Sequence, residues 1–147
     1  MNGTVAQQTD GRSTWTSQLV VRVYRATGGR LPRTDNGLPL LLLTTVGRRT
    51  GVPRTTAVAF IRDAERFLVA GTNRGRDGRP SWCVNLRADP SARVEVGRES
   101  WEVRAVSTSG RERDRWWDMM CQRQPGPTRY PAATDLVVPV FVLEPVS

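Results

Sequence analysis

The sequence predicts a mainly β, α+β domain in which six antiparallel strands form a small barrel with helices at its periphery. Two observations support this fold class. Apolar and β-branched segments follow one another as hairpins, and the helical segments are inserted between hairpins without a regular strand–helix alternation. The length of 147 residues suits one hydrophobic core and is too short for a second. We therefore expect residues 1–13 to be disordered and residues 14–147 to form one barrel domain with an N-terminal helix.

The first helix is expected over residues 14–27, before a glycine pair that ends it. Its apolar residues at helical spacing are Trp15, Leu19, Val23 and Ala26. The arginines that flank it are Arg22, Arg25, Arg30 and Arg33. Two interpretations stay open: a helix that packs on the domain with a solvated basic edge, or a helix that lies on an anionic membrane surface.

Two further helices are expected over residues 80–87 and 109–123. Proline is tolerated at the first position of a helix, which suits Pro80. Ser109 and Glu112 have the spacing of a capping box, in which the serine hydroxyl accepts a hydrogen bond from the first turn. The residues of this last helix that can face the core are Trp116, Met119 and Met120.

Six segments rich in apolar and β-branched residues predict strands. They cover residues 40–45, 55–62, 66–72, 92–96, 100–106 and 137–143. Reversals are expected at residues 63–65 and at Gly97-Arg98. Pro139 in the last segment predicts an edge strand or a bulge, because proline donates no hydrogen bond to a neighbouring strand.

The formal net charge is +8, and all 22 basic residues are arginine. Arginine binds phosphate and carboxylate with two parallel hydrogen bonds, so this surplus favours an anionic partner: nucleic acid, a membrane surface or a charged small ligand. No apolar run is long enough to span a bilayer, and residues 1–11 lack the apolar core of a signal peptide. We therefore expect a cytoplasmic protein, with contact at the inner membrane face as the alternative for the first helix.

The chain contains no histidine, which excludes the usual catalytic triad and His-based metal sites. Cys83 and Cys121 are far apart and lack metal-binding spacing, so they are expected as reduced, mostly buried thiols. No metal site is expected. Any enzymatic chemistry must then come from a cofactor or from less common side chains.

The clearest binding motif is the segment GRRTGVPRTT at residues 47–56. Its two glycines bend the backbone and can turn N–H groups towards one point. Arg48, Arg49 and Arg54 crowd this segment, and their guanidinium groups repel one another unless anions lie between them. The spacing predicts an anion-binding loop, with a solvated basic hairpin tip as the alternative.

Trp82 and Asn85 lie three residues apart in an expected helix and therefore share a face. An indole can flank an aromatic ring, and an amide both donates and accepts hydrogen bonds. Spacing alone favours the alternative, which is a core tryptophan with a capping asparagine. The Gly/Arg segment at residues 73–79 either closes over a ligand or forms a mobile surface loop.

In this order, the motifs LLLTTVGRRTGVPRTT, a hairpin, the Gly/Arg loop, PSWCVNLRADP and VPVFVLEP resemble the deazaflavin-dependent nitroreductase family over about residues 38–145. The resemblance implies a split β-barrel that binds coenzyme F420, an 8-hydroxy-5-deazaflavin. It also implies an oxidoreductase in which the reduced coenzyme donates a hydride to a small, planar, electron-poor acceptor such as a quinone, an enone or a nitroaromatic.

The resemblance implies roles for individual residues. Those at the phosphate and glutamate tail of the coenzyme are Arg48, Arg49 and Thr50. Those along the same groove and strand are Arg54, Thr56, Ala57 and Val58. Those at the deazaflavin ring and its polyol linker are Ala70, Thr72, Ser81, Trp82 and Asn85. Asn73 stands where the family often has lysine, and the neighbouring Arg74 is the candidate substitute.

The substrate side departs from better-known nitroreductase members, which carry several tyrosines after the long helix. This chain has Gln124 and Pro127 there and keeps Tyr130, the candidate to stack on the acceptor or to deliver a proton, with water as the alternative proton source. Other functions left open are an FMN-dependent oxidoreductase on the same barrel, a non-enzymatic coenzyme carrier and a nucleic-acid binder. Nucleic acid is disfavoured because aromatic residues are only 7% and three of the five tryptophans lie on expected helices.

Overall fold

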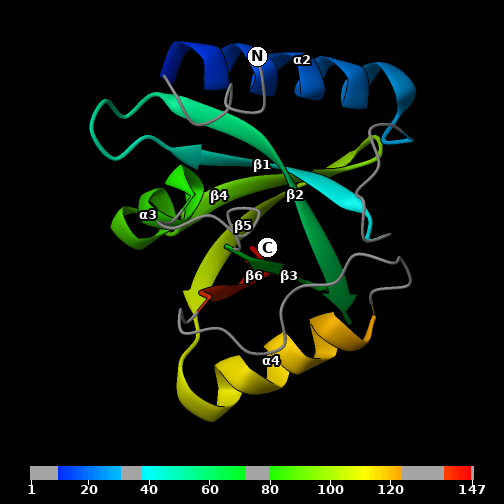
Figure 1. The fold of residues 1–147 in the computed structure, drawn as a ribbon, viewed down its shortest axis with the longest axis vertical. Helices are drawn as coiled ribbons and strands as arrows, with labels where there is room; N and C mark the ends of the chain where they lie inside the picture. Colours follow the sequence, from blue (N-terminus) through cyan, green and yellow to red (C-terminus); the bar gives the residue numbers. More distant parts are fainter. Residues whose placement is uncertain (1–9, 31–37, 72–79, 124–137, 147) are drawn as a thin grey trace.

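The computed structural model describes residues 10–30, 38–71, 80–123 and 138–146, with side chains described from residue 18 onward. Six strands form a closed antiparallel barrel in the order β1-β2-β3-β6-β5-β4 (Figure 1). The strands are β1 (Leu40–Val46), β2 (Pro53–Asp63), β3 (Arg66–Ala70), β4 (Ser91–Val96), β5 (Glu99–Ser107) and β6 (Val140–Pro145). The predicted fold class is therefore confirmed.

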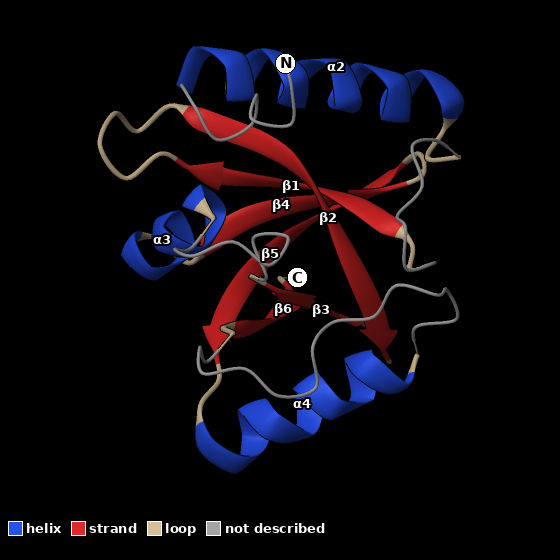
Figure 2. Cartoon of the chain, viewed as in Figure 1, coloured by secondary structure: helices blue, strands red, loops and turns tan. Residues whose placement is uncertain are grey.

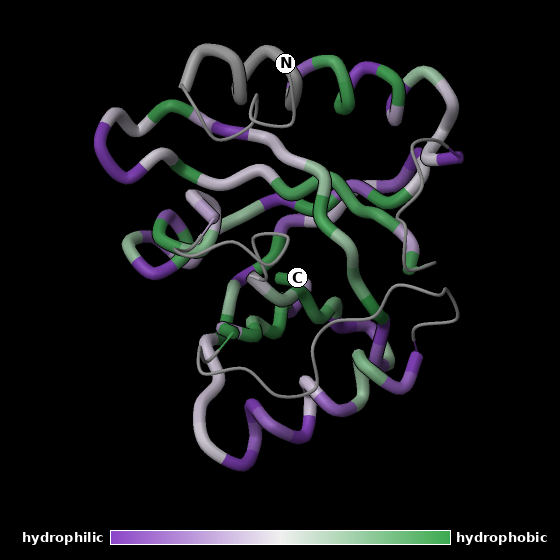
Figure 3. Tube along the Cα trace, viewed as in Figure 1, coloured by the Kyte–Doolittle hydropathy of each residue, from purple (hydrophilic) through white to green (hydrophobic). Residues whose placement is uncertain are grey.

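Strand alternation separates an inner face from an outer face of the barrel. On β1, Leu41 and Leu43 belong to the central core cluster, whereas Leu42 between them belongs to a separate cluster with α2. The central cluster includes Phe60, Phe67 and other residues from all six strands. Figure 3 shows apolar residues concentrated on the central strands, while the turn after β1 and much of the last helix are hydrophilic.

In the described part of the chain, three helices surround the barrel: α2 (Asp10–Thr27), α3 (Ser81–Ala88) and α4 (Gly110–Gln122). Figure 2 shows α2 along the strands β1 and β2, α4 on the opposite side of the molecule, and α3 beside the end where β1 finishes. Trp82, Cys83 and Leu86 of α3 join the central core, so this helix closes one end of the barrel. Within the described residues, no helix is long and apolar enough to cross a membrane.

The predicted core face of the first helix is wrong. Leu19 and Val23 remain 49% and 37% exposed, whereas Val21 and Tyr24 are buried against Leu42. The side chain of Trp15 lies outside the described residues. The helix also begins at Asp10, before the expected start near residue 14. Apolar spacing identified the helix, but valine occurs on both of its sides, and the sheet selected the side that carries the tyrosine.

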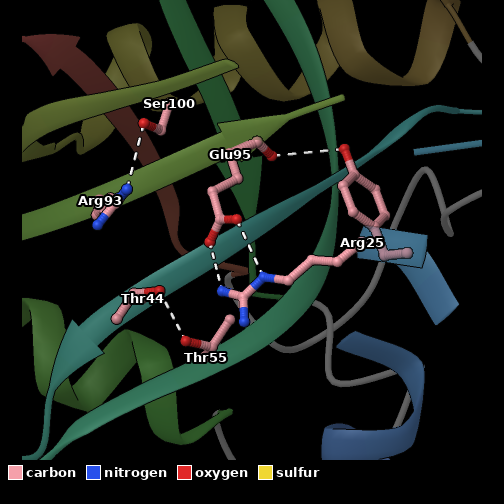
Figure 4. A network of polar contacts seen from close by, with 7 residues as sticks. Arg25, Thr44, Thr55, Arg93, Glu95 and Ser100 are labelled. Carbon is pink, nitrogen blue, oxygen red and sulfur yellow. Dashed lines mark hydrogen bonds and ion pairs between the residues drawn. The ribbon is translucent and has the colours of Figure 1, made fainter. Parts of the chain in front are cut away.

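Tyr24 and Arg25 attach α2 to β1 and β4, and Figure 4 shows the contact of Arg25 with Glu95 of β4. The Tyr24 hydroxyl donates to the Leu40 carbonyl at 3.0 Å and accepts from the Gly97 N–H at 3.0 Å. The Arg25 guanidinium makes two hydrogen bonds to the Glu95 carboxylate, at 3.1 and 2.7 Å. The hydrogen bond to this carboxylate raises the pKa of Arg25 above its ordinary value.

Two local predictions are also wrong. Pro139 precedes β6, and β6 lies between β3 and β5 in a closed barrel, so it is not an edge strand. Ser109 is the N-cap of α4, but its side chain makes no capping hydrogen bond. Gly110 has φ +60°, so the chain enters this helix through a left-handed residue and the capping-box geometry is lost. Cys83 is buried and Cys121 is half-buried, as expected.

Candidate functional site

The arginine-bearing segment forms the β1–β2 turn, residues 47–52, at the end of the barrel next to α3. The turn is held from within: the Gly47 N–H donates to Val52 O at 3.0 Å, and the Gly51 N–H donates to Gly47 O at 2.8 Å. The Val52 N–H donates to the Thr50 hydroxyl at 3.1 Å. A Cβ on Gly47 would lie 2.9 Å from Val52 O, and Gly51 has φ +74°, so both positions require glycine.

These bonds correct one expectation about the turn. The N–H groups of Gly47, Gly51 and Val52 are already used inside the turn, and that of Arg48 donates to a side chain, Asn85 Oδ1, at 3.2 Å. They therefore do not converge on an external anion. The candidate donors for an anion at this turn are therefore the arginine side chains, the hydroxyl groups and the N–H groups of Arg49 and Thr50.

The three arginines of this region are exposed and lie close together in the chain and across the hairpin. Among the ion pairs found in the described part of the chain, none includes Arg48, Arg49 or Arg54. Guanidinium groups without carboxylate partners keep their N–H donors available for phosphate or carboxylate. This donor set fits the phosphate and glutamate tail that the sequence resemblance implies.

Arg48 differs from the other two because it is tied to α3. Its Nη1 donates to Asn85 Oδ1 at 3.0 Å, in addition to the backbone bond to the same oxygen. The Asn85 amide nitrogen donates in turn to Thr45 Oγ1 at 3.1 Å. Asn85 and Thr45 are 3% and 2% exposed. A buried hydrogen-bonded pair therefore lies beneath the turn and orients Arg48.

The strand register brings together some of the predicted groove residues. Arg54 pairs with Thr45 across β1 and β2, and Thr56 pairs with Leu43, so both have the inward-facing register that Val58 shares in the core. Ala57 alternates with them, and its side chain packs against the cluster formed by Leu42 and α2. The side chain of Ala57 is therefore separated from those of Thr56 and Val58.

The predicted ring residues lie in different environments. Trp82 is 8% exposed in the central core, with its ring centroid 5.9 Å from that of Phe141 in an edge-on arrangement. Ser81 is exposed at the start of α3, and Ala70 packs in the cluster between the barrel and α4. Asn85 does not act as a capping side chain, because its amide bonds to Arg48 and Thr45.

Several predicted residues lie outside the described residues. They are Thr72, Asn73, Arg74, Gln124, Pro127 and Tyr130. Their roles stay predictions.

Sequence reasoning missed Thr45, which the structure places beside Asn85. Strand alternation after Leu41 and Leu43 was the available signal, since it puts a hydroxyl at an inward position near the end of β1.

Comparisons with known proteins agree on one kind of enzyme. A profile of the family described as F420H(2)-dependent quinone reductase matches residues 15–145. The chain is 33% identical over 125 residues to the F420H(2)-dependent quinone reductase Rv1261c of Mycobacterium tuberculosis, and the alignment covers 82% of this chain and 84% of that protein.

Solved structures give the same fold. The structure of an F420-H2 dependent reductase, FDR-A, superposes with a TM-score of 0.64 at 27% identity, covering 78% of this chain and 99% of that chain. A structure described as a domain-swapped dimer superposes with a TM-score of 0.65 at 24% identity, covering 90% of this chain and 98% of that chain. The second similarity indicates a shared fold alone.

Proposed function

The chain belongs to the F420H(2)-dependent quinone reductase family, and we propose that its β1–β2 turn holds the anionic tail of coenzyme F420 while the adjoining end of the barrel presents the ring to a quinone. Membership in this family confirms the cofactor and the reductase activity expected from the motifs. It also favours a quinone among the acceptors that the sequence left open.

The observation that carries the proposal is the set of arginines at the β1–β2 turn that form no ion pair with a carboxylate of the described residues. Arg48 is oriented by Asn85, and Arg49 and Arg54 project from the same turn and strand with their N–H donors available. Each guanidinium can make two parallel hydrogen bonds to a phosphate or carboxylate. A tail with a phosphate and glutamate carboxylates relieves the repulsion among these three cations, and Thr50 and Thr56 add hydroxyl groups nearby.

When bound, the reduced coenzyme supplies a hydride, which together with one proton converts a quinone into a hydroquinone. The chain contributes binding, orientation and exclusion of water. The arginines fix the tail, which leaves the ring with few orientations relative to the acceptor. We propose that Ser81, Ala70, Thr72 and Trp82 border the ring, with Arg74 beside the linker. The product proton comes from Tyr130 or from water.

The outward side of α2 gives a second element of the proposal, a contact with an anionic membrane surface. Leu19 and Val23 are exposed on this helix, and Arg22 lies between them in the sequence. An apolar strip beside arginine suits an interfacial helix.

Sedimentation with vesicles tests this membrane contact: anionic vesicles should retain the protein, neutral vesicles should not, and replacing Leu19 and Val23 with serine should abolish retention. Equal sedimentation of wild type and variant would contradict it.

Parallel titrations test the coenzyme site. Purified protein is titrated with coenzyme F420, with the tail-less deazaflavin and with FMN, and binding is followed by fluorescence. We expect the order of affinity to be full coenzyme, then FMN or the tail-less compound, and the advantage of the full coenzyme should decrease as salt increases. Equal affinity for the full and tail-less compounds would refute a role of the turn in holding the tail.

A further inference from the structure

We propose that Thr45 and Asn85 are positioning residues that act through Arg48: they set its backbone and guanidinium for the coenzyme tail before the coenzyme arrives. This inference rests on the proposed function, because it assigns the pair to the tail-binding part of the site. It also gives Asn85 a role different from direct contact with the deazaflavin ring.

The pair stands out by its burial. In the residues with described side chains, Thr45 and Asn85 are the buried polar residues, and they are hydrogen-bonded to each other. Thr45 lies on β1 and Asn85 on α3, and the two residues are 40 positions apart in the sequence. A buried polar group lowers stability unless it is paired, and an apolar pair of similar shape serves a core equally well. The pair therefore calls for an explanation other than filling the core.

The explanation lies in the atoms that the pair presents to the turn. Asn85 Oδ1 accepts from both the backbone N–H and the Nη1 of Arg48, at 3.2 and 3.0 Å. Thr45 Oγ1 accepts from Asn85 Nδ2, which fixes the amide with its oxygen towards Arg48. Without the threonine hydroxyl, the amide can rotate and offer its NH₂ group instead, which repels the Arg48 donors.

The arrangement leaves Arg48 suited to bind an anion. The described bond to Asn85 uses one of its five side-chain N–H donors, so the others remain for phosphate or carboxylate. Its side chain is exposed, and a long exposed side chain otherwise loses rotamer freedom when it binds a ligand. Prior orientation by Asn85 removes part of that cost, so the pair raises affinity for the tail without touching it.

Thr45→Val is the main test, because valine keeps the shape of threonine and removes the hydroxyl. Thr44→Val is the matched control: Thr44 is the neighbouring residue on β1, and its hydroxyl bonds to Thr55 at 2.7 Å in the alternate, outer register (Figure 4). We expect Thr45→Val to weaken binding of coenzyme F420 by about three- to tenfold. Binding of the tail-less deazaflavin should stay unchanged, Thr45→Ser should restore tail affinity, and Thr44→Val should have no effect on either ligand.

Steady-state kinetics and a double-mutant cycle separate positioning from a purely structural role. With a quinone as acceptor, Thr45→Val should raise the KM for the coenzyme and leave kcat unchanged. In an Arg48→Ala background, Thr45→Val should cause no further loss of tail affinity, because the residue it positions is absent. Additive effects of the two substitutions would overturn the inference, as would equal weakening of the full and tail-less compounds.

The double variant Thr45→Val/Asn85→Leu guards against simple misfolding, because it replaces both buried polar partners with apolar groups and leaves only the donors of Arg48, a residue exposed at the turn, without their acceptor. Its melting temperature should stay close to that of the wild type while tail affinity falls as in Thr45→Val. A stable double variant with wild-type affinity for the coenzyme would refute the positioning role. If wild-type protein itself fails to distinguish the full coenzyme from the tail-less compound, the proposed function fails instead.

Discussion

Arginines 48, 49 and 54 have the same charge but different environments. Arg48 bonds to Asn85 in the protein as folded, whereas Arg49 and Arg54 are exposed and form none of the ion pairs found among the described residues. An exposed guanidinium that meets a phosphate or carboxylate makes a charge-assisted hydrogen bond, the stronger kind available to a side chain. Loss of such an arginine should therefore weaken coenzyme binding and have little effect on folding.

Arg49→Ala tests this expectation. We expect a loss of about 1.5–3 kcal/mol of binding free energy for coenzyme F420, or about 10- to 150-fold in Kd. Arg98→Ala is the control, because Arg98 follows Gly97 in the β4–β5 turn at the other end of the barrel and carries the same charge. Fluorescence titration measures both variants. Equal losses for the two would mean that net charge, and not the turn, holds the tail.

Trp82 raises a different question, because it is a core residue as well as a predicted ring contact. With 8% exposure and an edge-on contact to Phe141, its indole contributes mainly to packing. We expect Trp82→Ala to lower the free energy of unfolding by about 3–5 kcal/mol, and Trp82→Phe to lower it less. Melting curves are compared with coenzyme titrations of each variant. An unchanged melting temperature combined with lost coenzyme binding would assign the indole to the ring site instead.

Among the elements, α2 packs on the barrel through Val21 and Tyr24, and the tyrosine adds hydrogen bonds to it. The Tyr24 hydroxyl bridges the Leu40 carbonyl and the Gly97 N–H, and its ring is 1% exposed. The neighbouring Arg25–Glu95 pair has a guanidinium side chain that is 54% exposed. Buried bonds whose loss leaves a group unpaired matter more than an exposed ion pair.

Tyr24→Phe should accordingly destabilise the protein by about 1–3 kcal/mol, because the Gly97 N–H and the Leu40 carbonyl lose their partner. Arg25→Ala, one residue away, should cost only about 0.2–1 kcal/mol. Denaturant unfolding gives both values, and hydrogen exchange shows whether the loss is local to α2 and the β4–β5 turn. A larger effect of Arg25→Ala would mean that the ion pair attaches the helix.

The whole molecule combines a closed barrel with a strongly basic surface. The six strands close into one barrel, and β2 takes part in both halves of it, pairing with β1 through residues 53–59 and with β3 through residues 60–63. The net charge is +8, and every positively charged side chain that contributes to it is an arginine. Such a charge concentrates anionic ligands around the protein and makes their association depend on salt.

The choice of acceptor belongs to this scale, because the family resemblance implies that residues 124–131 cover the substrate face. Three prolines in that segment restrict its backbone, and few aromatic side chains leave little stacking area for a bulky nitro compound. We expect small quinones to be reduced faster than nitroimidazoles, and Tyr130→Phe to lower the rate if Tyr130 delivers the proton. Steady-state rates decide both points: faster nitroimidazole turnover contradicts the first, and an unchanged Tyr130→Phe rate removes the second.

Much of the fold follows from local pattern. The hairpins around residues 63–65 and Gly97 appear where turn residues interrupt apolar segments, and all six strands form at the expected places within a few residues. The sequence also predicts an anion-binding role for the β1–β2 turn, because three arginines within a short segment repel one another without a counterion, and this role stays a prediction. Family resemblance in the motifs then led to the coenzyme.

Only the tertiary structure decided which face of a helix packs against the barrel and which distant residues come into contact. Period and apolar content predicted a helix before β1, but the barrel surface selected Val21 and Tyr24 over Leu19 and Val23. Helical spacing favoured a capping role for Asn85 and the family resemblance implied a contact with the ring, whereas its contact with Thr45 and Arg48 brings together segments far apart in the chain. Local spacing determines secondary structure because it acts within one turn or one strand. Contacts between distant segments depend on how the barrel closes, and no short stretch of sequence contains that information.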